Sequence, residues 1–452
     1  MALLVGQALL AGRQASVAIS YAEARPALAA LPDGVPPPLK GRPPREIEQA
    51  WPAWVAERNR EIRARVDGGD QDSLVNLWLY GTSFTRWPRV IDRDMRQAPD
   101  ALPAAEILDR RLDDFVSALA SPTTDQRLLL AKAVAGRAGL DVTTGGGRDR
   151  LRRYLQEGRV RAQAEFQGYA KALASAVRAD PDAELPTLAT LFRERGLSSD
   201  TSILPDFAVD QALEAIASQG IRAPGSVRRV AVIGPGLDFI NKADGQDFYP
   251  EQTTQPFAVV DSLIRLRLAA AEDVSLTAFD VSPRVVRHIA AAHARAETGV
   301  PYTLQLRLND DEPWSQGLTR YWERLGDRIG ESVAPVRAPA NAGAVRLRAV
   351  QVRSAIVRAV TAQDVNVVLE RLRLPEGQRF DLIVATNVLV YYDVFEQALA
   401  LTNIASMLEP GGVLLSNNLV QGAPPIFSPP FHMELTYSDR QRDHMFLYSR
   451  VK

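Results

Sequence analysis

The chain has 452 residues, with 53 Lys and Arg against 54 Asp and Glu, and a formal net charge of −1. A protein that binds a phosphate backbone needs an excess of basic residues, so this balance argues against nucleic acid as a partner. The absence of cysteine excludes disulfides, thiolate metal sites and cysteine nucleophiles. The 46% hydrophobic content is that of a globular protein, and the length predicts more than one core; we expect two domains.

The N-terminal stretch opens with an apolar run at residues 1–12, MALLVGQALLAG. It is shorter than the roughly 20 residues that cross a bilayer, so we expect no membrane association. A signal-peptide core is an alternative, because Ser16, Val17 and Ala18 form a small-x-small pattern, although no Lys or Arg precedes the run. A cytoplasmic protein is the main expectation and export the alternative. Residues 31–44, LPDGVPPPLKGRPP, exclude regular structure, so residues 1–44 are predicted to form an extended arm.

Residues 45–224 are predicted to form an all-α domain. Apolar residues recur there at steps of three and four, which is the helical period. One such face contains Ile107, Leu108, Leu112, Phe115, Val116 and Leu119.

The pattern changes at residue 225, and residues 225–452 are predicted to form a Rossmann-like domain. Apolar runs of strand length alternate with helical stretches, which indicates an α/β fold with a doubly wound parallel sheet. The expected strands are 229–233, 275–280, either 346–351 or 355–360, 380–386 and 412–416, and the expected helices are 256–271, 282–297, 364–373 and 393–408. Two later runs, HMELTY from His432 and HMFLYS from His444, predict an antiparallel pair at the edge of the sheet.

A glycine turn follows the first strand of this domain, in VAVIGPGLDF. Gly234 and Gly236 flank Pro235, and glycine allows both an unusual bend and close approach of a ligand to the backbone. The next strand, LTAFD, ends in Asp280, at the edge where parallel strands of such a sheet bind ligands. Its carboxylate is placed to accept both hydroxyls of a ribose, and a role as helix cap beside Ser282 is compatible with this.

Two later stretches complete the pattern: FDLIVATNVLVYYD at residues 380–393 and LEPGGVLLSNN at residues 408–418. Together with the glycine turn and the acidic strand end, they resemble class I S-adenosylmethionine-dependent methyltransferases over about half the chain. The NVLVYYD segment, from Asn387 to Asp393, is locally similar to the chemotaxis-receptor glutamate methyltransferases. The resemblance implies S-adenosylmethionine as cofactor, and a small-molecule or protein acceptor of its methyl group.

The resemblance also implies which residues bind the cofactor. The glycine turn, Gly234 to Gly236, corresponds to contacts near the amino-acid part, and Asp280 with Val281 to the ribose contact. Asp364 with Val365 matches the position of an acid that receives the adenine amino group. Asn387 would face the methionine part, or equally cap the following turn.

The sequence departs from the family pattern around the glycine turn. Val232 stands where the family has an acid, and Asp238 occupies the third glycine position, where its carboxylate is a candidate partner for the cofactor ammonium. An insertion at residues 238–255 is either a lid, with Asp247, Tyr249 and Gln252 as candidate contacts, or an ordinary surface loop. A second insertion, at residues 302–344, is expected to help shape the acceptor pocket.

Methyl transfer mainly needs alignment of the reacting atoms, so no strong catalytic motif is required. The Asn/Asp-Pro-Pro-aromatic motif of nucleic-acid nitrogen methyltransferases is absent, which favours an oxygen or carboxylate acceptor. Tyr391 is the catalytic candidate, with a packed aromatic as the alternative. No histidine has the spacing of a metal ligand, so no metal is expected.

Two other classes of function remain open. A nicotinamide-dependent oxidoreductase would require the motif GxGxxG and an acid about 20 residues further on. Counted from Gly234, the last glycine of that motif would fall at Phe239, and Asp280 is too distant to be the acid. A catalytically inactive binding or scaffold protein with a methyltransferase-like domain would show the same motifs. The sequence leaves the oligomeric state open.

Overall fold

The computed structural model describes residues 15–31, 34–90, 103–179, 196–238, 247–309, 313–343, 345–420, 426–439 and 441–451. The apolar run at residues 1–12 and Phe239 lie outside these ranges. Within them, no helix combines the length and the apolar character that crossing a membrane requires.

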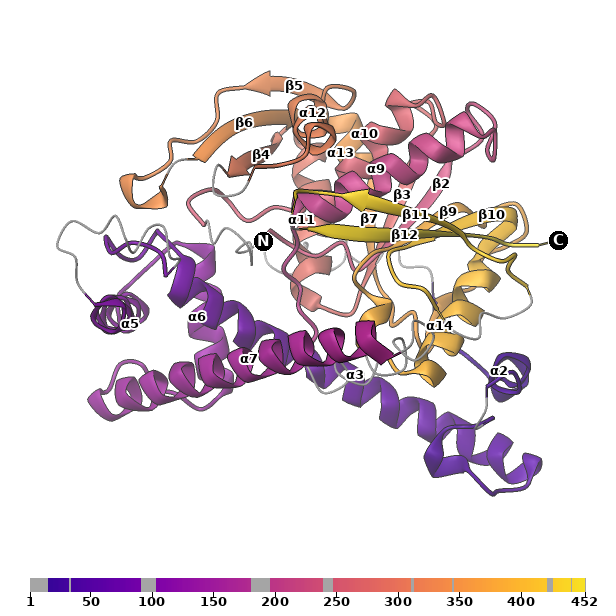
Figure 1. Ribbon diagram of the computed structural model, residues 1–452, viewed down its shortest axis with the longest axis horizontal. Helices are drawn as coiled ribbons and strands as arrows, with labels where there is room; N and C mark the ends of the chain where they lie inside the picture. Colours follow the sequence, from indigo (N-terminus) through magenta and orange to yellow (C-terminus); the bar gives the residue numbers. More distant parts are fainter. Residues whose placement is uncertain are drawn as a thin grey trace.

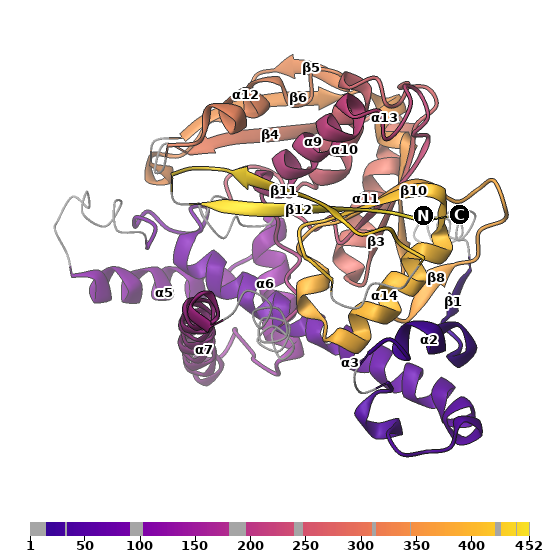
Figure 2. The ribbon, with the colours of Figure 1, turned by 45° about the vertical axis from the view of Figure 1, so that its right-hand side comes forward.

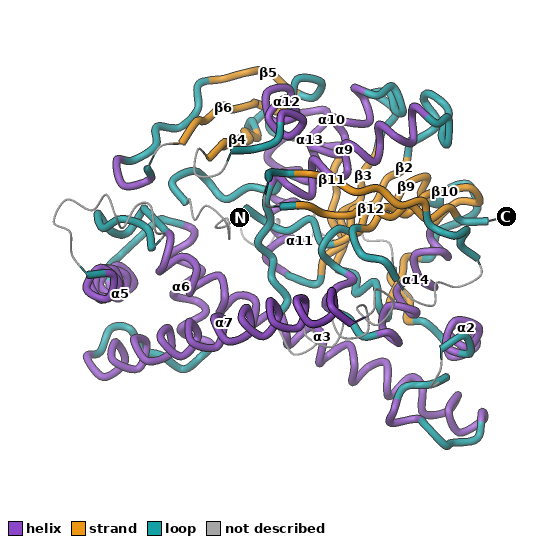
Figure 3. The backbone as a smooth tube through the Cα atoms, viewed as in Figure 1, coloured by secondary structure: helices purple, strands orange, loops and turns teal. Residues whose placement is uncertain are grey.

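A seven-stranded sheet, in the order β11-β12-β10-β9-β2-β3-β7, forms the centre of the C-terminal half (Figure 3). Its strands are β2 (Arg229–Ile233), β3 (Ser275–Asp280), β7 (Val360–Asp364), β9 (Phe380–Ala385), β10 (Leu408–Ser416), β11 (Phe431–Thr436) and β12 (Arg442–Ser449). The five strands from β7 to β10 are parallel, and β12 runs antiparallel to both of its neighbours. The predicted α/β doubly wound fold and its antiparallel edge pair are therefore confirmed.

Helices cover both faces of this sheet because its central strands are apolar on both sides. Val230 and Val232 of β2 face one core, which also contains α9 (Ile203–Ser218), α10 (Gln255–Arg265) and α11 (Pro283–Glu297). Ala231 and Ile233 face the other, which contains α14 (Val394–Met407). The crossover helices thus change faces between β2 and β9, which is the topological switch point of a doubly wound sheet.

The insertion between α11 and β7 forms a small antiparallel sheet of its own, in the order β4-β6-β5. Its elements are β4 (Tyr302–Asn309), α12 (Gln316–Arg324), β5 (Gly330–Val333) and β6 (Val345–Val352). Neither alternative for the third central strand was right, because β6 pairs in this small sheet and residues Ser354–Ala359 form helix α13. The third strand is β7, whose Val360 is buried against β3.

The predicted helix at residues 364–373 was also wrong. Its apolar residues lie at a spacing that fits a helix, but Val365, Val367 and Val368 are buried in an irregular stretch. The stretch leads into β8 (Glu370–Leu372), which pairs antiparallel with β1 (Ser16–Ala18). A partner far away in the sequence therefore overrides local helical periodicity.

The N-terminal region contains more regular structure than an extended arm. After β1 come α2 (Tyr21–Leu28) and the 3-10 helix η1 (Pro37–Leu39), and α2 lies beside α14 (Figure 2). Ser20 caps α2 through a reciprocal capping box with Glu23. The Trp51 indole donates to the Ile19 carbonyl at 2.8 Å, which fastens the segment to the next helix.

The described helices that follow are α3 (Pro44–Tyr80), α5 (Ala104–Ala120), α6 (Gln126–Arg137) and α7 (Gly145–Ala179). Figure 1 shows them together on the side of the molecule away from the small sheet. The 37-residue α3 belongs to two cores. Trp51 and Ile62 pack on the face of the central sheet that α14 covers, and Leu74 and Trp78 pack among α5, α6 and α7. Helix α9, by contrast, packs in the core of the central sheet. The division of the chain at residue 225 stays a prediction.

Candidate functional site

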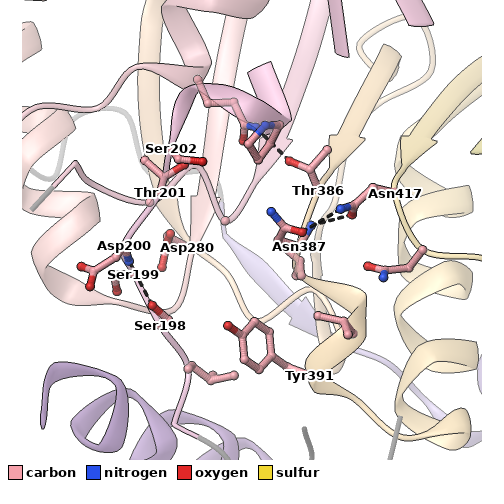
Figure 4. A pocket seen from close by; sticks show the side chains of 18 of the residues that line it. Ser198, Ser199, Asp200, Thr201, Ser202, Asp280, Thr386, Asn387, Tyr391 and Asn417 are labelled. Atoms are coloured by element: carbon pink, nitrogen blue, oxygen red, sulfur yellow. Dashed lines mark hydrogen bonds between the residues drawn. The ribbon is translucent and has the colours of Figure 1, made fainter. Parts of the chain in front are cut away.

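A cavity of about 520 Å³ opens at the carboxyl ends of β2, β3, β9 and β10. This is the crevice in which doubly wound sheets bind ligands, and its volume falls in the range of about 300 to 1,000 Å³ usual for small-molecule sites. Figure 4 shows Asp280 and residues 198–202 on one side of the cavity, and Asn387 and Asn417 on the other.

The glycine turn forms one wall, and its backbone is left-handed at Gly234 (φ 63°) and Gly236 (φ 65°). The Gly234 N–H donates to the Phe279 carbonyl at 2.8 Å, which holds the turn against the end of β3. A Cβ on Gly236 would lie 2.6 Å from the Ser199 carbonyl oxygen, and one on Gly234 would lie 2.6 Å from Val388 Cγ2. Glycine is therefore needed here for the packing of neighbouring segments, in addition to any approach of a ligand.

Asp280 lies where β3 ends and lines the cavity. Burial raises the pKa of its carboxyl to about 7, against the opposing effect of hydrogen bonds from the Ser282 and Gly236 backbone N–H groups and of the Arg284 charge. The Ser282 N–H donates at 2.7 Å. The carboxyl thus accepts from the N-cap residue of α11, Ser282, while it faces the cavity, and no side chain caps the first turn of the helix. We call Gly234, Gly236 and Asp280 the glycine side.

The opposite wall is built from side-chain amides at the ends of β9 and β10. The Asn387 N–H donates to Asn417 Oδ1, and Asn417 Nδ2 donates to Asn387 Oδ1, both at 2.7 Å. Asn387 has left-handed backbone (φ 57°), a conformation that asparagine tolerates better than most residues. Asn418 and Asp443 line the cavity beside this pair. We call Asn387, Asn417, Asn418 and Asp443 the amide edge.

Two adjacent tyrosines also line the cavity, in and after the 3-10 helix η3 (Leu389–Tyr391). Tyr391 is half-buried, and the Arg65 guanidinium donates to its backbone carbonyl at 2.9 Å. Tyr392 is buried in the core, and burial raises the pKa of its hydroxyl. The structure thus brings Tyr391 to the cavity, with a contact from α3 fixing its backbone.

A cover over the cavity comes from residues 198–202, SSDTS, which the sequence did not single out. The Leu237 N–H donates to the Ser199 carbonyl at 2.7 Å, and the Thr201 N–H donates to the Leu237 carbonyl at 3.1 Å. These bonds join the cover to the glycine turn as a parallel bridge. Five consecutive polar residues before the apolar helix α9 were the available signal, but only the fold shows which surface they cover.

Helix α3 contributes Val66 to the cavity lining, to which Leu197, the residue before segment 198–202, also belongs. The helix passes so close to Leu197 that a Cβ on Gly69 would lie 1.8 Å from its carbonyl oxygen. Arg58 forms an ion pair with Glu396 of α14 at 2.6 Å. The helical half therefore contributes directly to the cavity of the C-terminal half.

Of the predicted binding residues, Gly234, Gly236, Asp280, Val281 and Asn387 line the cavity, and Tyr391, the predicted catalytic residue, joins them. Pro235 is buried within the glycine turn. Val365 is buried in the core that contains α14. Asp364 is in register with Asp280 on the neighbouring strand, and its carboxylate forms an ion pair with Arg63 at 2.7 Å.

Asp238 does not line this cavity. Its carboxylate accepts from the Tyr249 hydroxyl at 3.0 Å and from Gln252 Nε2 at 3.1 Å, and it pairs with Arg307 at 3.2 Å. Asp247 accepts hydrogen bonds from both the backbone and the hydroxyl of Thr82 in the helical half. The described part of the 238–255 insertion is thus tied to neighbouring elements by buried polar contacts.

The histidines show no cluster of metal ligands: among the described residues, no group of three or more His, Asp or Glu is placed to hold an ion. His432 Nε2 and His444 Nδ1 are 2.9 Å apart on the exposed face of the β11–β12 pair. His288 Nε2 lies 2.9 Å from the Tyr302 hydroxyl, and burial lowers the pKa of this histidine to about 4.

No protein-family model and no curated protein sequence matches the chain. Solved structures that it resembles include TrmN from Thermus thermophilus (13% identity, 55% of this chain and 52% of that one, TM-score 0.27). Another is the N-methyltransferase NodS from Bradyrhizobium japonicum WM9, with 12% identity, coverage of 56% of this chain and 100% of that one, and a TM-score of 0.27. A third is the CurJ carbon methyltransferase, with 11% identity, coverage of 90% of this chain and 98% of that one, and a TM-score of 0.25. The chain therefore spans about half the length of TrmN. Two of these three proteins are named as methyltransferases.

Proposed function

We propose that this chain is an S-adenosylmethionine-dependent methyltransferase whose cofactor binds between the glycine side and the amide edge. The observation that carries the proposal is Asp280, a cavity-facing carboxyl at the carboxyl end of the strand beside the glycine turn. An acid in that position is suited to accept two ribose hydroxyls, and hydrogen bonds to a charged group contribute about 1.5 to 3 kcal/mol each.

The charge of the lining supports this cofactor. Of the described residues that line the cavity, none is lysine or arginine, while Asp280, Asp443 and Asp200 are acidic. S-adenosylmethionine carries a sulfonium and an ammonium against one carboxylate, so its net positive charge fits an acidic cavity. When bound, the sulfonium supplies an activated methyl group, and the protein's task is to align an acceptor with it.

The chain segment after the glycine turn and the order of the strands argue against a nicotinamide dinucleotide. Its pyrophosphate is normally held by the N-terminus of a helix that directly follows the glycine turn. Here Leu237 and Asp238, which come directly after the turn, form isolated bridges with Asp200 and Gln252, so no helix starts at these two residues. Counted from β7, the sixth strand of the sheet is the antiparallel β12, whereas the sixth strand of a dinucleotide-binding sheet is parallel to the others.

The residues of this chain would divide the work as follows. Asp280 holds the ribose, the glycine turn borders the amino-acid part, and residues 198–202 shield the cofactor from water. Tyr391 and the amide edge face the place where the acceptor enters. The absence of the Asn/Asp-Pro-Pro-aromatic motif favours oxygen or carboxylate acceptors over the bases of nucleic acids.

The direct test is a calorimetric titration with S-adenosylhomocysteine and, separately, NADH. We expect the first ligand alone to bind. Asp280→Ala should weaken its binding at least about tenfold, which corresponds to the loss of about 1.5 to 3 kcal/mol. Asp273→Ala, an exposed aspartate just before β3, is the matched control and should leave affinity unchanged.

Absence of S-adenosylhomocysteine binding by the wild-type protein would overturn the proposal. Binding that survives Asp280→Ala unchanged would remove the ribose assignment. A protein that binds the ligand but transfers no methyl group to any acceptor would be the scaffold that the sequence motifs also allow.

A further inference from the structure

We propose that Arg284 is a positioning residue, which holds the cover at residues 198–202 over the cavity by attracting Asp200. Three carboxylates from three separate segments of the chain meet at its guanidinium. The position of the cover is a property of the chain without ligand. The part that Arg284 plays in retaining the cofactor rests on the proposed function.

The cover is attached to its surroundings on two sides. Toward the glycine turn, the Leu237 N–H donates to the Ser199 carbonyl, and the Thr201 N–H donates to the Leu237 carbonyl. Toward α3, the Ser73 hydroxyl lies 3.0 Å from Asp200 Oδ2 and 3.1 Å from Asp200 Oδ1. The side chain of Asp200 has no exposed surface. The carboxylate of the cover is therefore held inside the protein, against the helical half.

Arg284 lies in the first turn of α11, shortly after Asp280, and its side chain is 12% exposed. Its Nη1 pairs with Glu251 at 2.8 Å, in the insertion that follows the glycine turn. Its Nη2 lies 3.9 Å from an oxygen of Asp200 and 4.0 Å from an oxygen of Asp70 in α3. One guanidinium thus links the helical half, the cover and the insertion, beside the strand end that carries Asp280.

The charges of this cluster make its arrangement depend on Arg284. The side chains of Asp70, Asp200 and Glu251 are mostly buried, so water screens their charges poorly. Arg137 of α6 pairs with Asp70 at 2.7 Å and offsets one of the three charges from another side. Without Arg284, the carboxylates that now approach one cation would repel one another.

The cover is the part of this cluster that is able to move. Asp70 is fixed in the 37-residue α3, and Glu251 is followed by the buried Gln252, whose amide is hydrogen-bonded through both its nitrogen and its oxygen. Asp200, in contrast, lies in an irregular segment that an isolated bridge to Leu237 joins to the glycine turn. Loss of Arg284 should therefore displace the cover, weaken this bridge and open a path by which the cofactor leaves.

The test combines two substitutions whose joint effect depends on charge. Arg284→Gln removes the cation and leaves the carboxylates together. Asp200→Asn removes one of their charges and keeps an oxygen that accepts from the Ser73 hydroxyl. Hydrogen exchange at the Thr201 and Leu237 N–H groups, measured on the full chain without ligand, reports the bonds between the cover and the glycine turn.

We expect Arg284→Gln to raise this exchange rate at least about tenfold, and Asp200→Asn alone to raise it about threefold. In the Arg284→Gln background, Asp200→Asn should lower the rate instead, because it relieves the repulsion. Arg284→Lys keeps the charge and should stay within about threefold of wild type. Dissociation of S-adenosylhomocysteine should accelerate in the same order. This ligand carries no net charge, so the changed charge of the protein has little direct effect on it.

The matched control is Arg287→Gln, an exposed arginine one turn further along α11, which should change neither rate. Unchanged exchange in β10 reports that the fold is intact. Wild-type exchange at the cover in Arg284→Gln, or losses that add when the two substitutions are combined, would overturn the inference. If Arg284→Gln does not fold, Asp200→Asn decides, and exchange at its cover equal to that of Arg287→Gln would overturn the inference. Failure of the wild-type chain to bind S-adenosylhomocysteine would overturn the proposed function instead, whatever the exchange rates of the unliganded variants show.

Discussion

The two walls of the cavity are built in different ways. On the glycine side, backbone N–H groups and closely packed chain segments leave almost no freedom, as the contacts of Gly234 and Gly236 show. On the amide edge, the Asn417 side chain bonds the backbone N–H and the side-chain oxygen of Asn387, and Asn418 Oδ1 is buried without a partner among the described residues. A wall set by backbone suits a ligand of constant shape, whereas a wall set by side chains is easily altered by substitution. The difference predicts that cofactor binding and acceptor choice are separable by mutation.

The largest effect is expected on the glycine side. Gly236→Ala puts a Cβ 2.6 Å from the Ser199 carbonyl oxygen at a left-handed position, so we expect about 3 kcal/mol lower unfolding free energy and weaker S-adenosylhomocysteine binding. Gly139→Ala is the control, because Gly139 is also left-handed (φ 70°) but has open space around its Cβ position. It should cost only about 1 to 2 kcal/mol and leave binding intact. Urea denaturation and calorimetry measure both, and equal losses for the two variants would contradict the packing argument.

An effect of comparable size, spread over about three pH units, is a pH dependence of stability caused by Asp280. In the folded protein without ligand its pKa is about 7, raised by burial from 3.8, so folding favours the protonated form. The free energy of unfolding should therefore fall as pH rises from about 4 to 7, by up to about 1.4 kcal/mol per unit from this group. Asp280→Asn removes that contribution.

The stability of Asp280→Asn relative to wild type should consequently increase from pH 5 to pH 7 and level off above it. Urea denaturation at each pH measures this difference, which cancels the contributions of other titrating groups. A difference that does not change with pH would mean that the Asp280 carboxyl is ionised throughout this range.

A smaller effect is expected on the amide edge. Asn417→Ala removes both hydrogen bonds to Asn387, so we expect a loss of about 1 kcal/mol of stability and slower methyl transfer. Affinity for S-adenosylhomocysteine should stay within about twofold. If the affinity instead falls as far as in Asp280→Ala, the two walls do not divide the work in the way proposed here.

The smallest effect is expected at Asp364. Its carboxylate pairs with Arg63 and does not line the cavity, so Asp364→Ala should change S-adenosylhomocysteine affinity less than about twofold. The ion pair is partly exposed, so its loss should cost at most about 1 kcal/mol. A tenfold drop in affinity would show that Asp364 contacts the cofactor, as the sequence resemblance implies.

The sequence predicted the parts of the fold that local pattern controls. Strands β2, β3 and β9 and helices α11 and α14 lie close to their expected positions because apolar runs and helical periods are continuous there. The third strand and β8 were missed because their pairing depends on β3 and on β1, which are distant in sequence. Propensity within a short window does not contain that information.

The site was predictable to a similar extent. Asp280 and the glycines stand at strand ends, which sequence order locates directly. The cover at residues 198–202, the amide of Asn417 and the carboxylate of Asp443 come from three separate parts of the chain, so only the fold brings them to one cavity. Asp238 and Asp364 pair with Arg307 and Arg63 and do not line the cavity, and their contact with a cofactor stays a prediction.

The pairing of β1 with β8 has a consequence for how the chain is made. Glu23, just after β1, forms an ion pair with Arg371, a residue 348 positions later. At a synthesis rate of about 5 to 20 residues per second, the N-terminal segment waits roughly 20 to 70 s on the ribosome before its partner is made. During that time its apolar residues, among them Ile19 and Leu28, can pack against α3 but not yet against β8 and α14 of the same core. Release of the nascent chain, and any chaperone that holds it, should therefore limit the yield of folded protein more than the folding of the helical segments does.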